Sequence, residues 1–164
     1  MQVRKVETDQ VPEVFSFVQA AISKMISQGI FQWDEIYPTQ EDFFVDAQNN
    51  QLYMVEIEGR PAACFTLNKD CDEDYKNGNW NYTGEDYVVV HRLCVNPEFQ
   101  NQGVGRETCL KIEELVKPQG VKAIKLDCFT QNPYSQKMYA KLGYKIVGYA
   151  DWRKGHFALM EKIL

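Results

Sequence analysis

The feature that most constrains the fold is a strand, a glycine-bearing turn and a helix in direct succession within residues 88–117. Residues 88–95 are rich in β-branched and apolar side chains, which predicts a largely buried strand. Asn96-Pro97 ends this strand, because proline cannot donate to a ladder and the residue before it avoids helical backbone. A helical pattern follows and closes at Lys117-Pro118, a cation followed by a helix breaker.

The turn between strand and helix is suited to an anion. It consists of Gln100, Asn101, Gln102, Gly103, Val104 and Gly105, and Arg106 follows it. A helix start exposes unpaired N–H groups and the positive end of the dipole, and glycines remove the Cβ atoms that would keep a ligand away. We therefore predict a phosphate or pyrophosphate site built from the backbone. The alternative is that Gly103 and Gly105 only permit a tight connection.

Two standard phosphate motifs do not fit this turn. There is no G-x-x-x-x-G-K-[ST] sequence, which excludes a Walker-type loop. A dinucleotide fingerprint requires a third glycine where this chain has Thr108, although Asp127 does follow in the next apolar run. Several predicted strands also precede the turn, which is unusual for a first Rossmann unit.

Two motifs resemble those of the GNAT acetyltransferase superfamily. The Q-x-x-G-x-G turn follows a strand ending in R-L-x-V-x-P, which is similar to the acetyl-CoA-binding motif of that family. Residues 132–135 (Asn-Pro-Tyr-Ser) and 137–144 (Lys-Met-Tyr-Ala-Lys-Leu-Gly-Tyr) resemble its second motif. The resemblance covers roughly residues 86–149, and the two motifs stand in the family's order and spacing.

The resemblance implies an α/β (α+β) fold of the GNAT type, and we expect residues 1–164 to form one domain. The expected sheet is mixed and mostly antiparallel, with about seven strands, splayed at the centre and covered by helices on both faces. Strands are predicted at 3–6, 52–57, 61–67, 88–95, 121–128, 144–149 and 156–163. Helices are predicted from Asp9 to about 29, at 39–47, after the glycine turn to 117, and at 132–141.

Local signals place several boundaries. Asp9 is expected to cap the first helix, with Pro12 in its first turn. Thr39 and Asp42 form a capping-box pattern for the second helix. Residues 58–61 (Glu-Gly-Arg-Pro) predict a hairpin turn. The acidic stretch 68–84 is expected to be a long loop or a distorted hairpin.

The resemblance also implies how acetyl-CoA is held. Its pyrophosphate would lie on N–H groups between Gln100 and Arg106, and its pantetheine arm would pair with the strand before them. The cofactor-binding residues are then Leu93, Cys94, Val95, Gln100, Asn101, Gln102, Gly103, Val104, Gly105, Arg106, Asn132 and Ser135. An N–H near Cys94 or Val95 would stabilise charge on the thioester oxygen.

The implied reaction is direct attack of a neutral amine on the acetyl carbon. Tyr139 occupies the family's general-acid position and would protonate the departing thiolate; the alternative is a helix residue that only packs its ring. The base is open, because the position of the family's strand carboxylate is Val90 here. His91 is assigned as a catalytic candidate, and the other candidates, acting through water, are Glu35, Asp86 and Glu85.

Residues 31–37 are expected to form the acceptor pocket. Trp33 and Tyr37 would supply apolar walls or a cation–π surface, and Asp34 or Glu35 would pair with a substrate ammonium. Asp86 is assigned to the substrate side as well. The alternative is an aromatic cluster that seals the first two helices onto the sheet.

Composition limits the partners. The net charge of −5 argues against nucleic acid and suits a cationic amine. Five cysteines without a C-x-x-C, and two histidines without ligand spacing, indicate reduced thiols and no metal site. Without a signal peptide or a membrane-spanning apolar run, we expect a cytoplasmic protein with no membrane contact.

We therefore predict an acetyl-CoA-dependent N-acetyltransferase acting on a small primary amine. A protein or peptide N-acetyltransferase and a non-catalytic acyl-CoA-binding module are the alternatives. The resemblance implies that a homodimer is possible, and no residue of this sequence decides it.

Overall fold

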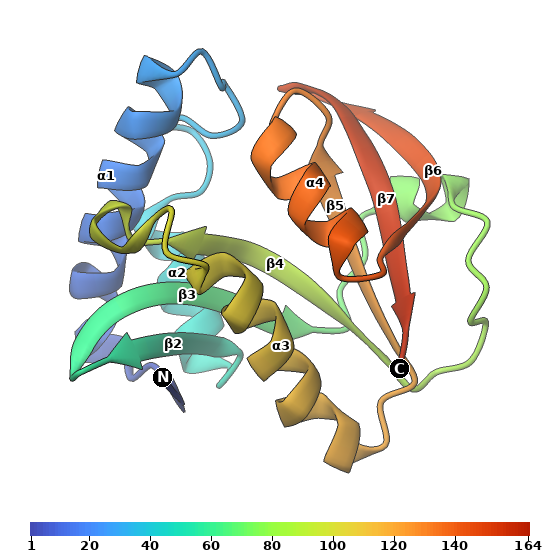
Figure 1. Ribbon diagram of the computed structural model, residues 1–164, viewed down its shortest axis with the longest axis horizontal. Helices are drawn as coiled ribbons and strands as arrows, with labels where there is room; N and C mark the ends of the chain where they lie inside the picture. The colour runs from blue at the N-terminus through green and yellow to red at the C-terminus, as the bar shows by residue number, and fades with distance from the viewer. The chain divides into compact units, whose positions relative to one another are not determined.

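The computed structural model describes residues 1–164, and its seven strands form one sheet with the order β1-β2-β3-β4-β5-β7-β6 (Figure 1). The strands are β1 (Gln2–Lys5), β2 (Leu52–Ile57), β3 (Arg60–Asn68), β4 (Tyr87–Val95), β5 (Ala123–Phe129), β6 (Lys145–Trp152) and β7 (Gly155–Ile163). β4 and β5 pair in parallel, whereas β1/β2, β2/β3, β5/β7 and β6/β7 pair antiparallel. The predicted mixed, mostly antiparallel sheet is confirmed.

Helices connect these strands. The α-helices are α1 (Val11–Ser27), α2 (Gln40–Gln48), α3 (Val104–Val116) and α4 (Pro133–Lys141). Short 3₁₀ turns are η1 (Thr8–Gln10), η2 (Glu73–Asn77), η3 (Pro97–Phe99) and η4 (Lys117–Gln119). The chain divides into two compact units. The first unit is residues 1–67 with 91–111, and the second unit is residues 68–90 with 112–164.

The first unit has its core between the two N-terminal helices and the first strands. Buried apolar residues shared by these elements are Val6, Val11, Val14, Phe17, Val18, Ala21, Ile22, Trp33, Phe43, Ala47, Leu52, Met54, Cys64 and Cys94. The α1 residues among them recur at helical spacing, as the sequence predicts. Removing these side chains from water is the main stabilising contribution of the unit.

The predicted cap of α1 at Asp9 is wrong. Asp9 lies inside η1, and the N-cap of α1 is Gln10, which leaves Pro12 in the first turn as expected. The Gln10 N–H donates to the Glu7 carbonyl at 3.0 Å, which is the bond of a 3₁₀ turn, and the Glu7 N–H donates to Gln10 Oε1 at 3.1 Å.

Two other local predictions of the first unit, the capping box and the hairpin turn, are confirmed. The N–H of Thr39 donates to Asp42 Oδ2 at 2.7 Å and the N–H of Asp42 to Thr39 Oγ1 at 3.2 Å, which is a capping box. Glu58 and Gly59 have φ values of 51° and 73°, as a two-residue hairpin turn requires. β3 begins at Arg60, one residue before the predicted start.

The second unit contains β5, β7 and β6 with the first residues of β4. The parallel ladder of β4 with β5 runs from Tyr87 opposite Ala123 to Val89 opposite Lys125. The turn between β6 and β7 is tighter than the predicted strands at 144–149 and 156–163 imply, because pairing continues to Trp152 opposite Gly155.

Residues 69–86, hereafter the strap, connect β3 to β4 and form the long loop predicted at 68–84, with η2 inside it. The N–H of Asn79 donates to the Val147 carbonyl of β6 at 2.8 Å. A Cβ on Gly148 would lie 2.7 Å from the Asn77 carbonyl oxygen, so glycine is needed for this close approach. Since β6 is the last strand of the sheet, the strap covers part of an edge that would otherwise expose backbone groups.

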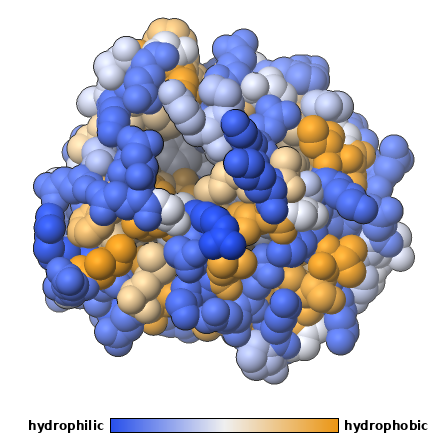
Figure 2. Space-filling view, in the orientation of Figure 1, coloured by the Kyte–Doolittle hydropathy of each residue, from blue (hydrophilic) through white to orange (hydrophobic).

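The surface drawn in Figure 2 is mostly hydrophilic, with hydrophobic side chains in separate small groups. None of the helices combines the length and the apolar composition that crossing a membrane requires.

Candidate functional site

The glycine turn of the first unit opens α3 as predicted. The first bond of the helix runs from the Glu107 N–H to the Gly103 carbonyl at 3.0 Å. The N–H groups of Val104, Gly105 and Arg106 therefore precede the helical ladder and have no acceptor within it. Gly103 has a φ of 78°, and a Cβ there would meet no atom within 4 Å. Glycine is thus favoured by the backbone conformation rather than by crowding within the protein.

Polar side chains hold this turn in shape. Gln100 Nε2 donates to the Val95 carbonyl at 3.3 Å, and Gln102 Nε2 donates to the Glu98 carbonyl at 3.1 Å. The exposed Arg106 pairs with Glu107 at 2.6 Å. Attraction for an anion therefore comes chiefly from the backbone N–H groups and the α3 dipole, which is the donor set that a diphosphate needs.

The strand before the turn contains a left-handed residue. Arg92 has a φ of 53° although it lies within β4, and Leu93, Cys94 and Val95 follow it. Such a residue interrupts the regular alternation of a strand and produces a bulge. A bulged strand loses regular pairing, so its main-chain groups can serve a ligand.

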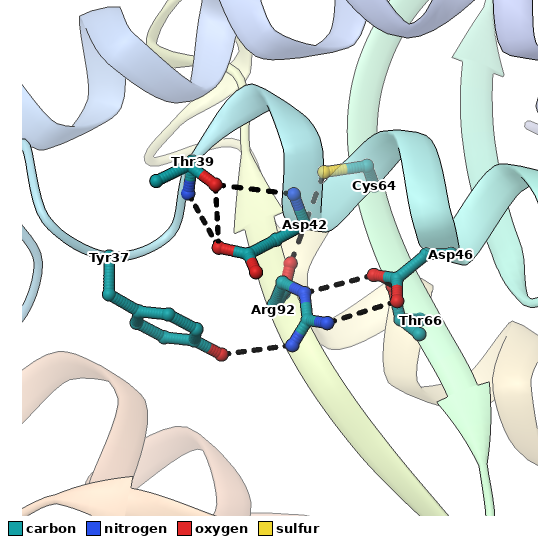
Figure 3. Close-up of polar contacts among 7 residues, drawn as sticks. All are labelled: Tyr37, Thr39, Asp42, Asp46, Cys64, Thr66 and Arg92. Carbon is teal, nitrogen blue, oxygen red and sulfur yellow. Dashed lines mark hydrogen bonds and ion pairs between the residues drawn. The ribbon is translucent and has the colours of Figure 1, made fainter.

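Arg92 is the centre of a polar network in the first unit (Figure 3). Its Nε donates to Asp46 Oδ2 and its Nη2 to Asp46 Oδ1, both at 2.9 Å. Thr66 Oγ1 donates to Asp46 Oδ2 at 2.7 Å. Arg92 Nη1 donates to Tyr37 Oη at 2.9 Å. The network joins α2, β3, β4 and the loop before α2, and nothing in the local sequence pattern reveals it.

The predicted acceptor loop divides between core and surface. Trp33 is buried in the core of the first unit, whereas Glu35 and Tyr37 are exposed. The N–H groups of Ile36 and Tyr37 donate to Asp34 Oδ1 at 3.0 and 3.2 Å, so Asp34 shapes the loop. The structure brings Tyr37 to the Arg92 guanidinium and turns Trp33 inward.

In the second unit, α4 starts at the second motif. The Asn132 side chain caps the helix by accepting from the N–H groups of Tyr134 and Ser135, at 3.2 and 3.3 Å. Ser135 Oγ lies 3.3 Å from Cys128 Sγ of β5. Tyr139 is buried, and its ring meets that of Tyr144 edge-on with centroids 5.4 Å apart.

Sequence reasoning did not assign Asp127 to the site. It lies on β5, two residues past Lys125, where the ladder with β4 ends. Tyr75 Oη from the strap donates to Asp127 Oδ2 at 2.8 Å. Burial raises the pKa of Asp127 to about 6, against a smaller lowering by the Tyr75 hydrogen bond. An acid within a largely apolar strand, residues 123–129, is the sequence signal that points to it.

The strap is fixed to the rest of the second unit at further points. Trp152 Nε1 donates to Asp74 Oδ2 at 2.9 Å. Glu161 is buried and accepts from the N–H groups of Asn81 and Tyr82, each at 2.9 Å. Together with the Tyr75 bond to Asp127, these contacts hold Tyr75 over the β5 carboxylate.

The other predicted acid–base groups are less enclosed. His91 is half-buried on β4 in the first unit. Asp86 and Glu85 are exposed at the end of the strap. The Asp86 carbonyl accepts the Lys122 N–H at 2.7 Å, and Tyr82 Oη lies 3.5 Å from its carboxylate.

Burial keeps three cysteine thiols of the chain in the neutral form. Burial raises the pKa of Cys94 to about 12 and that of Cys128 to about 11, and it raises the pKa of Cys64 well above its ordinary value. A thiolate is the nucleophilic form, so none of these three cysteines is suited to accept an acyl group at neutral pH. The chain also has no group of three or more His, Cys, Asp or Glu side chains that could hold a metal ion.

Comparison with known proteins identifies the fold. The model of the acetyltransferase (GNAT) family matches residues 18–144. A GNAT-family acetyltransferase of Streptococcus agalactiae superposes with a TM-score of 0.87 at 21% identity, covering 99% of this chain and 95% of that chain. An N-acetyltransferase of Thermoplasma acidophilum, solved in complex with coenzyme A, gives 0.71 at 16% identity over 99% and 98%.

Two further matches are a ribosomal-protein N-acetyltransferase and a longer protein. The ribosomal-protein-S18-alanine N-acetyltransferase of Escherichia coli gives a TM-score of 0.73 at 16% identity over 99% of this chain and 92% of that one. An uncharacterised N-acetyltransferase of Methanocaldococcus jannaschii is 24% identical over 96 residues, which are 57% of this chain and 38% of that protein. The match thus spans well under half of that relative.

Proposed function

Because the chain belongs to the GNAT acetyltransferase family, we propose that it transfers the acetyl group of acetyl-CoA to the primary amine of a small molecule by direct attack. The observation that supports this proposal most directly is the backbone conformation at the start of α3. Gly103, in left-handed conformation, leads into N–H groups that precede the helical ladder, at the position of the family's Q-x-x-G-x-G motif. Neutral backbone donors there suit the diphosphate of the cofactor.

The segment Leu93–Val95 carries the pantetheine arm in this proposal. The left-handed Arg92 precedes it, and Gln100 fixes the Val95 carbonyl at its end. In the second unit, Asn132 and Ser135 at the start of α4 are the further cofactor-binding residues that the family resemblance implies. Acetyl-CoA supplies an activated thioester, and the chain positions it and handles the protons.

Direct attack is supported by the state of the thiols. A covalent acetyl-cysteine intermediate needs a thiolate, and burial keeps Cys94 and Cys128 protonated by raising their pKa values to about 12 and about 11. Tyr139 protonates the departing thiolate of coenzyme A. Asp127, with its pKa raised to about 6, accepts the proton of the amine, because a base works best when its pKa lies near the operating pH.

The acceptor is a cationic amine held by exposed groups. Glu35 and Asp86 supply negative charge, and Tyr37 supplies an aromatic face. His91 is a second candidate for moving the proton. The cytoplasmic location and the single domain over residues 1–164 are predictions that accompany this proposal, and the family resemblance makes a homodimer possible.

A protein substrate is the second candidate. The fold is shared with the ribosomal-protein-S18-alanine N-acetyltransferase of E. coli, whose acceptor is a protein. A panel of free amines and N-terminal peptides, assayed by release of free thiol, separates the two. Turnover of small amines supports our proposal, and turnover confined to peptides contradicts it.

Binding of the cofactor is tested by thermal shift with acetyl-CoA, because a ligand that binds only the folded state stabilises it. Gly103→Ala should weaken the shift. Gly120→Ala is the matched control, since Gly120 also has a left-handed φ, of 84°, and open space around a Cβ. Binding without transfer to any acceptor would instead indicate a non-catalytic acyl-CoA-binding module, and an absent shift in the wild-type protein would refute the proposal.

A further inference from the structure

A residue with an unfavourable backbone conformation lies in the middle of β4. Arg92 has a φ of 53°, whereas residues other than glycine strongly prefer a negative φ. Within a strand this conformation turns the chain and changes the direction in which the following residues point. Such a conformation persists only where the surroundings hold it.

The contacts of Arg92 provide that hold. Its guanidinium makes a two-point ion pair with Asp46, which is 4% exposed, and its own side chain is 16% exposed (Figure 3). Thr66 donates to the same carboxylate, so the position of Asp46 is itself fixed. The main chain is held as well, because the Cys64 thiol lies 3.9 Å from the Arg92 carbonyl oxygen.

We propose that Arg92 and Asp46 are positioning residues, whose ion pair holds residue 92 in the left-handed conformation and so sets the direction of the Leu93–Val95 main chain. The inference rests on the proposed function, in which that segment pairs with the pantetheine arm and faces the thioester. The planar guanidinium matters because a two-point contact fixes orientation as well as distance. Neither residue touches the reacting atoms.

The same guanidinium reaches the acceptor loop. Arg92 Nη1 donates to Tyr37 Oη, and the guanidinium carbon lies 5.7 Å from the centre of the Tyr37 ring. The ion pair therefore fixes a residue of the acceptor side and the strand of the cofactor side from one point within the first unit.

The test uses the conformational preference of glycine. In an Asp46→Asn background, which leaves no unpaired carboxylate, we compare Arg92→Ala with Arg92→Gly. Glycine adopts a positive φ without penalty and alanine does not. The affinity for acetyl-CoA, measured by calorimetry, should be about tenfold lower in the alanine variant than in the wild-type protein. The glycine variant should regain most of the lost affinity.

Arg4 and Glu56 provide the matched control. They form an ion pair between β1 and β2 of the same unit, with Arg4 Nη2 2.8 Å from Glu56 Oε1. Arg4 has no left-handed conformation, so in a Glu56→Gln background glycine should be no better than alanine at residue 4. A general loss of stability would affect both sites alike, whereas positioning predicts rescue by glycine only at residue 92.

Equal affinity of the alanine and glycine variants at residue 92 would overturn the proposal. Arg92→Lys keeps the charge without the two-point contact, so binding as tight as wild type in that variant would also overturn it. Should the wild-type protein fail to bind acetyl-CoA, the proposed function fails; crystal structures of the variants then decide this inference. A left-handed residue 92 in the alanine variant refutes it, and a right-handed or extended one supports the hold by the ion pair.

Discussion

Asp46 and Asp127 are two carboxylates that folding withdraws from water, one in each unit, and their partners differ in kind. Asp46 receives two hydrogen bonds from the cationic Arg92 and one from Thr66. Asp127 receives a hydrogen bond from the neutral phenol of Tyr75. The first carboxylate has its charge balanced by a cation, whereas burial of the second raises its pKa to about 6.

The difference separates two uses of a buried acid. A buried carboxylate that a cation pairs at two points is held in a fixed place, because breaking the ion pair would leave an uncompensated charge. Such a pair can therefore fix the main chain of the residues that form it. A desolvated carboxylate with a neutral partner gains and loses its proton near neutral pH, which suits general acid–base chemistry. The structure therefore indicates rigidity around Arg92, and the raised pKa supports the proposal that Asp127 transfers a proton.

Removing the Asp46 carboxylate, whose charge Arg92 balances, should have the largest effect on stability. Asp46→Ala leaves the mostly buried Arg92 guanidinium without an anionic partner, so the free energy of unfolding should fall by about 3–5 kcal/mol. Urea denaturation measures this. Glu56→Ala is the control: its partner Arg4 is 31% exposed, and the loss should be about 1 kcal/mol or less. Similar losses in the two variants would contradict the distinction between them.

Replacing the Asp127 carboxylate, which gains and loses a proton, should lower turnover. Asp127→Asn keeps an acceptor for Tyr75 but cannot take a proton, so kcat/KM should fall about 100-fold. The logarithm of kcat/KM should rise with pH with a slope of about 2 below pH 6, where both the amine and Asp127 must lose a proton, and about 1 above it.

The same pH profile gives the control for that substitution. Asp127→Asn should show a slope of about 1 throughout, and Asp127→Glu should keep a break because it keeps a carboxyl group. Unchanged turnover in Asp127→Asn would remove Asp127 as the base and return His91, Glu35, Asp86 and Glu85 as the candidates.

The two acids also show what the sequence could reveal. The glycine turn, the Thr39 capping box and the hairpin at Glu58 were predictable, because each depends on residues that are close in the chain. The cap of α1 was not, since a 3₁₀ turn displaced the helix start past Asp9. Trp33 was ambiguous because an irregular aromatic segment has no periodicity that separates a core face from a pocket.

The decisive contacts of both acids are long-range. Asp46 and Arg92 are 46 residues apart, and Tyr75 and Asp127 are 52 apart. No local pattern encodes either pair. The family motif located the turn and Tyr139, but the left-handed conformation of Arg92 depends on a partner that only the folded chain supplies.

A smaller effect should appear in the pH dependence of stability. The pKa of Asp127 is raised in the folded protein above its ordinary value of 3.8, so the folded state binds this proton more tightly than the unfolded chain does. Ionisation therefore destabilises the fold increasingly between about pH 4 and pH 6, and the penalty is fully present above pH 6. Asp127→Asn should gain about 1–3 kcal/mol at pH 8 relative to wild type and much less at pH 4. Urea denaturation at the two pH values measures the difference, and an equal gain at both would contradict the assigned cause.

The smallest effect should come from a pair that folding leaves in water. Lys76 and Glu73 of the strap are 3.0 Å apart, but their side chains are 66% and 86% exposed. Solvent screens such a pair, so Lys76→Ala should change the free energy of unfolding by about 0.5 kcal/mol or less, and 1 M salt should abolish the change. A loss that approached that of Asp46→Ala would mean that η2 is held by this pair. The large loss expected of Asp46→Ala could then not be attributed to burial of its ion pair, because an exposed ion pair would stabilise the fold as strongly.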